Sequence, residues 1–307
     1  MRIAIIGGGS VGGLIAYFLY RGGVRDIHVY YRSWRSVEAV EEHGGLTIVL
    51  SSGEEYFVPV KPLHHTMPYG KYDVVFNAVK AVDVESTAEL MRSVDNGYTL
   101  YISLQNGFGS CEYMEELFTP YRVACGVVRL GAQRINPYTI LERGIGSVVL
   151  GQHKGLHRNL QEITRILLAG GCPSWITMDI DFDRWLKLGV NAVINPLTAI
   201  TRSKNKIVLT RWGMELARSI IEELSLAARL HGYSIDPDRL YRHVLRVARV
   251  TSENYSSMAQ DILAGRPTEI DYINGFIVTT LERHGYKSIV NSVIVKIIHL
   301  IEESRIK

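Results

Sequence analysis

The sequence predicts an α/β amino-terminal domain over residues 1–180, followed by an all-α carboxyl-terminal domain over residues 181–307. Short β-rich runs alternate with helical patterns through the first 150 residues, and a glycine-rich turn directly follows the first run. Beyond about residue 179, long amphipathic stretches replace the strand-like runs. Such alternation is typical of parallel strands joined by right-handed crossovers. A chain of 307 residues is long enough for two domains that each bury a core.

The composition excludes several classes of protein. Apolar residues make up 47% of the chain and charged residues 21%, which is ordinary for globular domains. The net charge of +3 is too small for a nucleic-acid-binding surface, and no apolar run reaches the roughly 18 residues of a membrane span. We therefore expect neither nucleic acid nor a membrane as a partner. An apolar strand pattern starts at Ile3 and leaves no room for a signal peptide, which predicts a cytoplasmic protein.

The cysteines and histidines form no recognisable ligand pattern. Cys111, Cys125 and Cys172 are scattered, without Cys-x-x-Cys spacing. An odd and unclustered set argues against a disulfide framework and against a structural zinc site. The ten histidines also lack metal-ligand spacing. We expect a protein without a metal, in a reducing compartment.

Individual elements follow from hydrophobic periodicity. In the first domain we expect strands at residues 2–6, 27–31, 74–78, 99–103, 123–128 and 147–150, and a helix at residues 11–20. Residues 138–150 are a candidate antiparallel addition to the sheet. In the second domain we expect helices at residues 183–200, 210–231, 238–264 and 268–284. Asp-Pro-Asp at 236–238 and Gly-Arg-Pro-Thr at 265–268 separate them.

The glycine-rich turn predicts a dinucleotide-binding, Rossmann-like domain. The run Gly7-Gly8-Gly9-Ser10-Val11-Gly12 matches G-x-G-x-x-G between the first strand and an apolar helix. In this context Gly7 permits the tight turn, Gly9 lets a diphosphate approach the backbone, and Gly12 lets the helix pack near the strand. The amino terminus of the helix then faces the phosphates. An ordinary strand-to-helix turn is the alternative.

The end of the second strand favours NADPH over NADH. The run Val29-Tyr30-Tyr31-Arg32 carries no carboxylate. NAD-preferring sites place an acidic residue here to hold the ribose hydroxyls, whereas an arginine suits a 2′-phosphate. A charge-assisted hydrogen bond contributes about 1.5–3 kcal/mol, a preference of roughly ten- to a hundredfold. We expect NADPH as the cofactor, with NADH as the alternative. We expect Arg32 to bind the 2′-phosphate, and the alternative is that it is a solvated loop arginine.

The segment from Trp185 to Ala199 carries a polar face on an apolar helix. Lys187, Asn191 and Asn195 recur every four residues, so they share one side of the helix. Polar side chains in such surroundings need buried partners or a polar ligand. Lys187 alone is equally compatible with a snorkelling lysine that reaches water. Pro196 is expected to bend the helix or to end its first segment.

Three further polar features lie downstream. Hydroxyl side chains occur at Ser256 and Ser257. Thr268 is expected to cap the next helix and to place Glu269 in the first turn, where its carboxylate would compensate the helix dipole. A basic stripe is formed by Arg239, Arg242, Arg246 and Arg249. We interpret the stripe as a solvated face, with an anion, a partner or a phosphate-bearing regulator as alternatives.

Together these segments resemble the ketopantoate reductase family. The matching motifs are GGGSVG from Gly7, VKA from Val79, QNG from Gln105, KLGVNAVINPLTA from Lys187, SSMAQD from Ser256 and GRPTEIDYINGF from Gly265. They occur in family order over nearly the whole chain, and the carboxyl-terminal motifs are far more specific than the glycine-rich turn. The chain departs from the family at residues 286–291, where members often carry a proline and this sequence has none.

The resemblance implies a reaction and a set of residue roles. It implies reduction of 2-dehydropantoate (ketopantoate) to (R)-pantoate by NADPH, in pantothenate and coenzyme A biosynthesis. Lys187 is implied as the general acid, and Glu269 as a substrate-site residue that supports the lysine and also lies at the cofactor. The implied substrate-binding residues are Asn106, Asn191, Asn195 and Ser257. Lys80 and Asn106 match positions near the cofactor.

Elementary chemistry agrees with these roles. Hydride delivered to the C2 ketone leaves an alkoxide that needs a proton, and a lysine with an ordinary pKa of about 10.4 is protonated at neutral pH. Two alternatives stay open: a related NAD(P)-dependent reductase of another 2-oxo acid or an imine, and a non-catalytic module that senses NADPH. The apolar helical domain is compatible with a homodimer.

Overall fold

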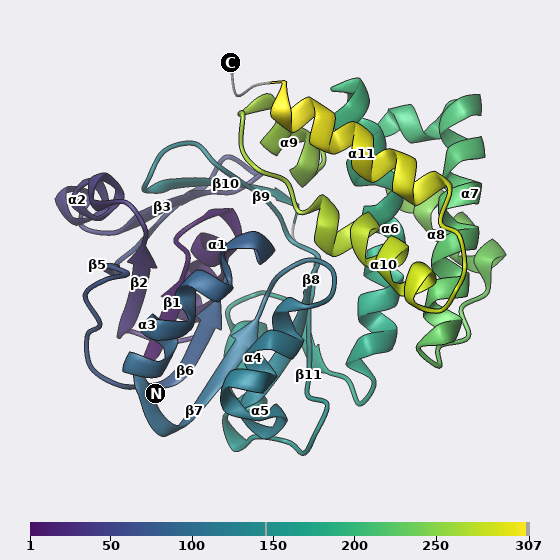
Figure 1. The fold of residues 1–307 in the computed structure, drawn as a ribbon. Coiled ribbons are helices and arrows are strands. Elements are labelled where there is room, and N and C mark those ends of the chain that lie inside the picture. The colour runs from purple at the N-terminus through teal and green to yellow at the C-terminus, as the bar shows by residue number, and fades with distance from the viewer. Residues whose placement is uncertain (145, 305–307) are drawn as a thin grey trace. The chain divides into compact units, whose positions relative to one another are not determined.

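The computed structural model describes residues 1–144 and 146–304 and forms two compact units. Unit 1 comprises Met1–Gln105 and Gly109–Ile180, and unit 2 comprises Asn106–Phe108 and the chain from Asp181 onward. Unit 1 is α/β and is mostly purple to teal in Figure 1, whereas unit 2 is helical and is mostly teal-green to yellow. The predicted fold class is confirmed. The segment 106–108, which lies within the expected first domain, packs instead with the helices.

Unit 1 is built on an eight-stranded sheet. Its strands are β1 (Ile3–Ile6), β2 (Ile27–Tyr31), β5 (Lys61–His64), β6 (Tyr72–Asn77), β7 (Asp95–Ser103), β8 (Val123–Val128), β11 (Val148–Gly151) and β12 (Ser174–Ile176), in the order β12-β11-β8-β7-β6-β1-β2-β5. The strand pairs are parallel except for β8 with β11. β1 lies between β2 and β6, so the crossovers diverge there, and such a switch point is where ligands of these sheets bind.

A second sheet of four strands was not foreseen as a separate layer. Its strands are β3 (Leu46–Val49), β4 (Glu55–Val58), β9 (Gly131–Arg134) and β10 (Thr139–Gly144), in the order β4-β3-β10-β9. The expected addition at residues 138–150 therefore divides, because β10 joins this sheet while β11 joins the large one. Helix α1 (Ser10–Arg21) packs against the small sheet. A Cβ atom on Gly13 would lie 2.6 Å from the Cδ1 atom of Ile140, so the glycine leaves room for this side chain against the helix.

Further helices complete unit 1. They are α2 (Trp34–His43), α3 (Ala88–Ser93), α4 (Ser110–Phe118) and α5 (Arg158–Ala169), with short 3₁₀ turns η1 (Ala81–Asp83), η2 (Glu85–Thr87) and η3 (Pro120–Arg122). α1 packs against α5 as well as the small sheet. Along residues 1–144 and 146–304, no helix has the length and hydropathy needed to cross a bilayer.

A buried disulfide joins Cys111 of α4 to Cys125 of β8, with a Cα–Cα distance of 5.7 Å. The expectation of unpaired cysteines was wrong, because a helix and a strand bring together residues that carry no local spacing signal. Cys172 is a buried free thiol. Glu115 lies close to both paired sulfur atoms, but a zinc site of this kind needs the thiolates that the disulfide consumes.

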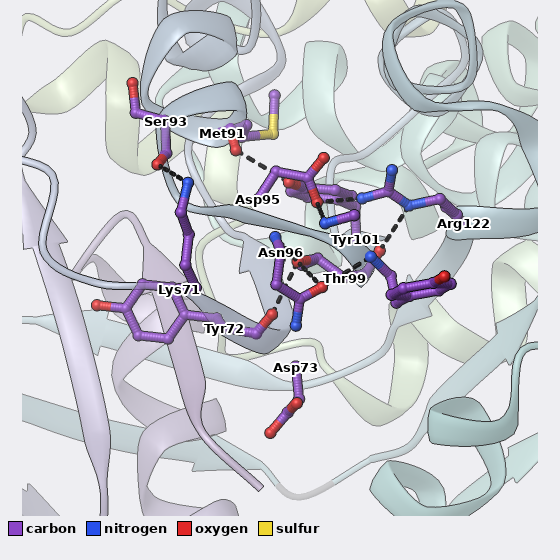
Figure 2. A network of polar contacts seen from close by, with 12 residues as sticks. Lys71, Tyr72, Asp73, Met91, Ser93, Asp95, Asn96, Thr99, Tyr101 and Arg122 are labelled. Carbon is purple, nitrogen blue, oxygen red and sulfur yellow. Dashed lines mark hydrogen bonds and ion pairs between the residues drawn. The ribbon is translucent and has the colours of Figure 1, made fainter.

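A network of hydrogen bonds and an ion pair stabilises the amino end of β7 (Figure 2). Thr99 Oγ1 donates to the Tyr72 carbonyl at 2.7 Å, and Arg122 binds the Asp95 carboxylate and donates to the Thr99 carbonyl. Burial raises the pKa of Asp95, but hydrogen bonds from Arg122 and from the Gly97 N–H outweigh it and hold that pKa below its ordinary value. Ligands of parallel sheets bind at the opposite, carboxyl edge, so we interpret this network as structural.

Unit 2 consists of helices. They are α6 (Ile180–Thr201), η4 (Asn205–Leu209, 3₁₀), α7 (Arg211–Leu230), α8 (Pro237–Val250), α9 (Ser257–Leu263), the π-helix η5 (Asp271–Gly275), α10 (Phe276–Arg283) and α11 (Val290–Glu303). The single helix expected at residues 238–264 is two helices, because Ser256 caps α9 by accepting a hydrogen bond from the Ala259 N–H at 3.0 Å. The helix expected at residues 268–284 contains the π-helix.

α6 continues through Pro196 and does not end there. A proline has no N–H, so the carbonyl four residues earlier loses its helical donor. That carbonyl belongs to Ala192, and the Asn274 side chain donates to it at 3.0 Å. The buried Asn274 side chain also donates to Asn291 Oδ1 at 2.8 Å. A long-range amide therefore replaces the missing hydrogen bond and allows the helix to continue.

The start of α11 is held by a carboxylate from α7. Glu223 accepts hydrogen bonds from the backbone N–H groups of Ile289 and Val290, both at 2.8 Å, and from Ser288 and Asn291. A proline at position 289 or 290 would lack one of these donors, which fits the absence of the family's proline from this segment. Burial raises the pKa of Glu223, but the hydrogen bonds from Asn291, Val290 and Ser288 outweigh it and lower that pKa.

We predict that Glu223→Gln lowers the free energy of unfolding by about 1–3 kcal/mol at pH 7, because buried donors lose a charged acceptor. The folded-state pKa is depressed, so the stabilisation is present above the ordinary carboxyl pKa of about 4.3 and is lost as the pH falls through the folded value. Urea unfolding at pH 7 and pH 3 measures the difference, with the exposed neighbour in Glu222→Gln as control. Equal stability of wild type and Glu223→Gln at pH 7 would contradict this account.

Candidate active site

The glycine-rich turn lies at the carboxyl end of β1. Gly7 has φ +105°, and a Cβ atom there would lie 2.8 Å from the backbone of Ala78 and Val79, in the loop after β6. The Gly7 N–H donates to the Tyr30 carbonyl at 3.0 Å. A side chain at this position would therefore strain the backbone and collide with the neighbouring loop.

The space next to the helix start is open. A Cβ atom on Gly9 would meet no atom of the described residues within 4 Å, whereas one on Gly12 would lie 2.1 Å from the Gly7 carbonyl oxygen. Ser10 begins α1, and the half-buried Val11 packs on the core of unit 1. Open space beside the N–H groups of a helix start fits the phosphates of a dinucleotide.

Gln105 fixes the loop that follows β6. Its Nε2 donates to the carbonyls of Asn77 at 3.0 Å and Val79 at 2.9 Å, and its Oε1 accepts from the Ser103 hydroxyl at 2.6 Å. Lys80 follows directly in this loop and is half-buried. The QNG motif thus divides between the two units, since Gln105 belongs to unit 1 and Asn106 to unit 2.

Arg32 lies just beyond β2, at the position expected for a phosphate ligand. Its guanidinium contacts Asp83 Oδ1 at 3.0 Å, and its side chain is 79% exposed. The sequence did not reveal this carboxylate partner, which partly compensates the charge of the arginine. An exposed ion pair of this kind contributes little free energy, so Arg32 is able to exchange Asp83 for another anion.

In unit 2, three of the expected site residues are joined by hydrogen bonds. Asn106 Nδ2 donates to Glu269 Oε2 at 2.8 Å, and Asn191 Nδ2 donates to Asn106 Oδ1 at 3.3 Å. Lys187 is half-buried one turn before Asn191 on α6, and Asn195 is buried one turn after it. Residues far apart in sequence thus form one polar cluster on an apolar helical unit.

A close approach to the π-helix positions Asn106. Gly107 has φ +81°, and a Cβ atom there would lie 1.9 Å from the Tyr272 carbonyl oxygen. That carbonyl accepts a hydrogen bond from the Phe108 N–H at 3.3 Å. The Phe108 ring stacks on Phe276 at 4.6 Å and packs against Trp185 at 4.9 Å. π-Helical turns often mark functional sites, and this one receives the segment that carries Asn106.

Sequence reasoning missed Arg184. This buried side chain donates to Asp181 Oδ1 at 2.7 Å and to the Gly107 carbonyl at 3.4 Å, and its guanidinium lies 4.0 Å from the centre of the Phe108 ring. It therefore anchors the 106–108 segment to α6. The available signal was a lone arginine three residues before Lys187 in an apolar stretch.

Glu269 precedes the helix instead of lying in its first turn. The helix starts at Ile270, so Thr268 lies two residues before it and is not its N-cap as expected, although the Ile270 N–H donates to Thr268 Oγ1 at 3.3 Å. The Thr268 N–H in turn donates to Glu302 of α11 at 2.7 Å. With its backbone held in this way, Glu269 directs its carboxylate to Asn106. This hydrogen bond, and not compensation of the helix dipole, accounts for the orientation of the carboxylate.

The two serines differ in environment. Ser257 is exposed as the first residue of α9, whereas Ser256 is buried and its hydroxyl pairs with Thr198 Oγ1 at 2.6 Å. Ser256 is thus a structural residue that the sequence did not distinguish from its neighbour. The arginines of the basic stripe are exposed along α8; they are Arg239, Arg242, Arg246 and Arg249.

Comparisons with known proteins identify related chains. Two family profiles match, described as "Ketopantoate reductase PanE/ApbA" over residues 3–155 and "Ketopantoate reductase PanE/ApbA C terminal" over residues 179–302. The chain is 31% identical to the 2-dehydropantoate 2-reductase of Archaeoglobus fulgidus over 305 residues, which cover 98% of each protein.

Solved structures share the fold over the whole chain. A PanE/ApbA family ketopantoate reductase from Ralstonia eutropha has a TM-score of 0.89 at 27% identity, with 100% of both chains covered. D-mandelate dehydrogenase with NADH and anilino(oxo)acetate has a TM-score of 0.94 at 22% identity, also with 100% of both chains covered. The second likeness concerns the fold alone.

We predict that Gly107→Ala lowers the free energy of unfolding more than Gly285→Ala does. Both glycines have φ near +80°, so each variant incurs about 1–2 kcal/mol of left-handed strain. Only the Cβ atom at position 107 collides with a carbonyl, whereas the one at 285 meets open space among the described residues. Urea unfolding of the two variants measures the difference. Equal losses would show that the contact with Tyr272 imposes no constraint.

Proposed function

This chain belongs to the ketopantoate reductase family, and on that basis we propose that it reduces 2-dehydropantoate to (R)-pantoate with NADPH. The reaction serves pantothenate and coenzyme A biosynthesis. We assign cofactor binding to unit 1 and substrate binding to unit 2, which includes Asn106–Phe108, and we expect a cytoplasmic homodimer. The 31% identity to a full-length 2-dehydropantoate 2-reductase supports the choice of substrate.

The polar cluster of unit 2 carries the proposal. The hydrogen bonds from Asn191 to Asn106 and from Asn106 to Glu269 gather amide groups and a carboxylate, and Asn191 lies one turn after Lys187 on α6. A lysine supplies a proton and a positive charge, and the neutral amides orient an oxo acid without adding charge. A module that only senses NADPH has no need of this combination.

Unit 1 fits a dinucleotide, since Gly9 opens onto free space at the helix start and Gly7 makes the turn that exposes it. When bound, the dinucleotide supplies the hydride that the C2 carbon of the substrate accepts. We assign the phosphate-binding turn to Gly7, Gly8, Gly9, Ser10, Val11 and Gly12, with Lys80 in the adjacent loop. The exposed Arg32 favours NADPH, with NADH as the alternative.

Lys187 is the proposed general acid. As negative charge develops on the oxygen at C2, the Lys187 ammonium donates a proton to that oxygen and completes the alcohol. Glu269 supports the lysine by its opposite charge and holds Asn106 in place. We propose that Asn106, Asn191, Asn195 and Ser257 bind the carboxylate and the hydroxyl of the substrate.

The experiment that tests the proposal is oxidation of NADPH by the purified protein, followed by its ultraviolet absorbance. We expect turnover with ketopantoate and little with pyruvate or a cyclic imine, and slower turnover with NADH than with NADPH. Turnover only with another oxo acid or an imine would support a related reductase. Binding of NADPH with no turnover of any substrate would support the sensing module.

Lys187→Ala should lower kcat with ketopantoate by roughly 10²–10⁴-fold, because the alkoxide loses its proton donor. The Kd for NADPH should stay close to the wild-type value, since Lys187 lies in the helical unit. Steady-state kinetics and a fluorescence titration measure the two effects. Lys296→Ala, which removes an exposed lysine of α11, is the matched control. A kcat of the Lys187 variant within a few-fold of wild type would remove this lysine from the mechanism.

A further inference from the structure

Arg134 reaches the glycine-rich turn from the second sheet. It is the last residue of β9, an edge strand of the four-stranded sheet that packs against α1. Its backbone N–H donates to Ser10 Oγ at 3.0 Å, and its guanidinium donates to the Gly8 carbonyl at 3.4 Å. A positive charge therefore lies against the turn, although it comes from a strand more than 120 residues later.

The charge of Arg134 is not compensated by an acid. Its side chain is exposed, and among residues 1–144 and 146–304 no carboxylate pairs with it. Arg32 differs in this respect, since it contacts Asp83. An arginine that meets only a neutral carbonyl keeps its capacity for a charge-assisted bond to an anion.

A second observation at the same place points to a missing partner. Tyr31 is 4% exposed, and its ring lies against the turn, with Cε1 2.0 Å from where a Cβ atom of Gly8 would be. The Tyr31 hydroxyl is buried and has no hydrogen-bond partner among the described residues. Burial raises the pKa of Tyr31, and the positive charge of Arg134 opposes this rise, so the phenol stays a neutral donor near the guanidinium. Buried polar groups without partners are rare in proteins and often indicate a ligand or a water.

We infer that Arg134, with Tyr31 beside it, binds the diphosphate of the dinucleotide. Its contacts are to Gly8 and Ser10, within the turn that approaches the diphosphate in folds of this type, whereas Arg32 lies at the end of β2, where the ribose is bound. The open space at Gly9 leaves room for the phosphates next to these groups. Since NADH and NADPH share the diphosphate, Arg134 contributes to the affinity for both and does not discriminate between them.

This inference rests on the proposed function only in assuming that the turn binds a pyridine dinucleotide. Isothermal titration calorimetry without substrate tests it, with NADPH and NADH as separate titrants. We expect Arg134→Ala to raise the Kd for both dinucleotides by a similar factor, roughly ten- to a hundredfold. Arg32→Ala should raise the Kd for NADPH more than that for NADH.

Matched controls separate a binding role from a structural one. Arg143→Ala removes an exposed arginine of the same sheet, one that binds the neutral Gln133 side chain, and should leave both Kd values unchanged. Arg134→Lys keeps the charge and should recover part of the affinity lost in Arg134→Ala. Thermal unfolding of each variant identifies any loss that comes from misfolding. Tyr31→Phe should raise both Kd values by a smaller factor than Arg134→Ala, because it removes a single neutral donor.

Two results would overturn the inference. Kd values of Arg134→Ala within twofold of wild type for both dinucleotides would remove Arg134 from the site. A loss confined to NADPH would assign it to the 2′-phosphate and contradict its place at the diphosphate. The outcome is independent of the substrate, since a protein that binds dinucleotides through Arg134 but does not reduce ketopantoate would refute the proposed function alone.

Discussion

The hydrogen bond from Asn106 to Glu269 is the interaction on which the proposed substrate site depends. It joins a three-residue segment that leaves the large sheet after β7 to the residue that precedes the π-helix. The segment is held in place because Gly107 lets it approach the Tyr272 carbonyl and because Phe108 packs against aromatic rings and Arg184. Backbone conformation, aromatic packing and a buried cation thus all contribute to the position of one amide group.

The proposed cofactor site in unit 1 is built differently. Backbone groups of two loops form it, and side chains add charge and fix the loops. The parallel strands bring the turn after β1 beside the loop after β6, and Gln105 fixes that loop through two carbonyls. Two arginines come from separate elements of this unit: Arg32 is paired with Asp83, and Arg134 donates to the Gly8 carbonyl of the turn. In the proposed account, these two arginines bind separate phosphates of the dinucleotide.

Much of the fold and of the candidate site was predictable, because the sequence patterns that indicate them are local. Buried strands, the glycine-rich turn and the spacing of Lys187, Asn191 and Asn195 all depend on short-range periodicity, and the resemblance to a family supplied the roles. What sequence reasoning missed depends on contacts between distant residues. The pairing of Cys111 with Cys125 is of this kind, and so is the Asn274 amide that allows α6 to pass through Pro196. A single sequence carries no periodic signal for such pairs.

The central claim is that this chain transfers hydride to C2 of ketopantoate, and isotopic labelling tests it most directly. NADPH carrying deuterium at C4 of the nicotinamide, prepared separately on each face, is incubated with the protein and ketopantoate, and the product is analysed by mass spectrometry. The account predicts pantoate with one deuterium at C2 from one of the two labelled cofactors and unlabelled pantoate from the other. Recovery of unchanged ketopantoate would contradict it, and so would pantoate that lacks deuterium with both labelled cofactors.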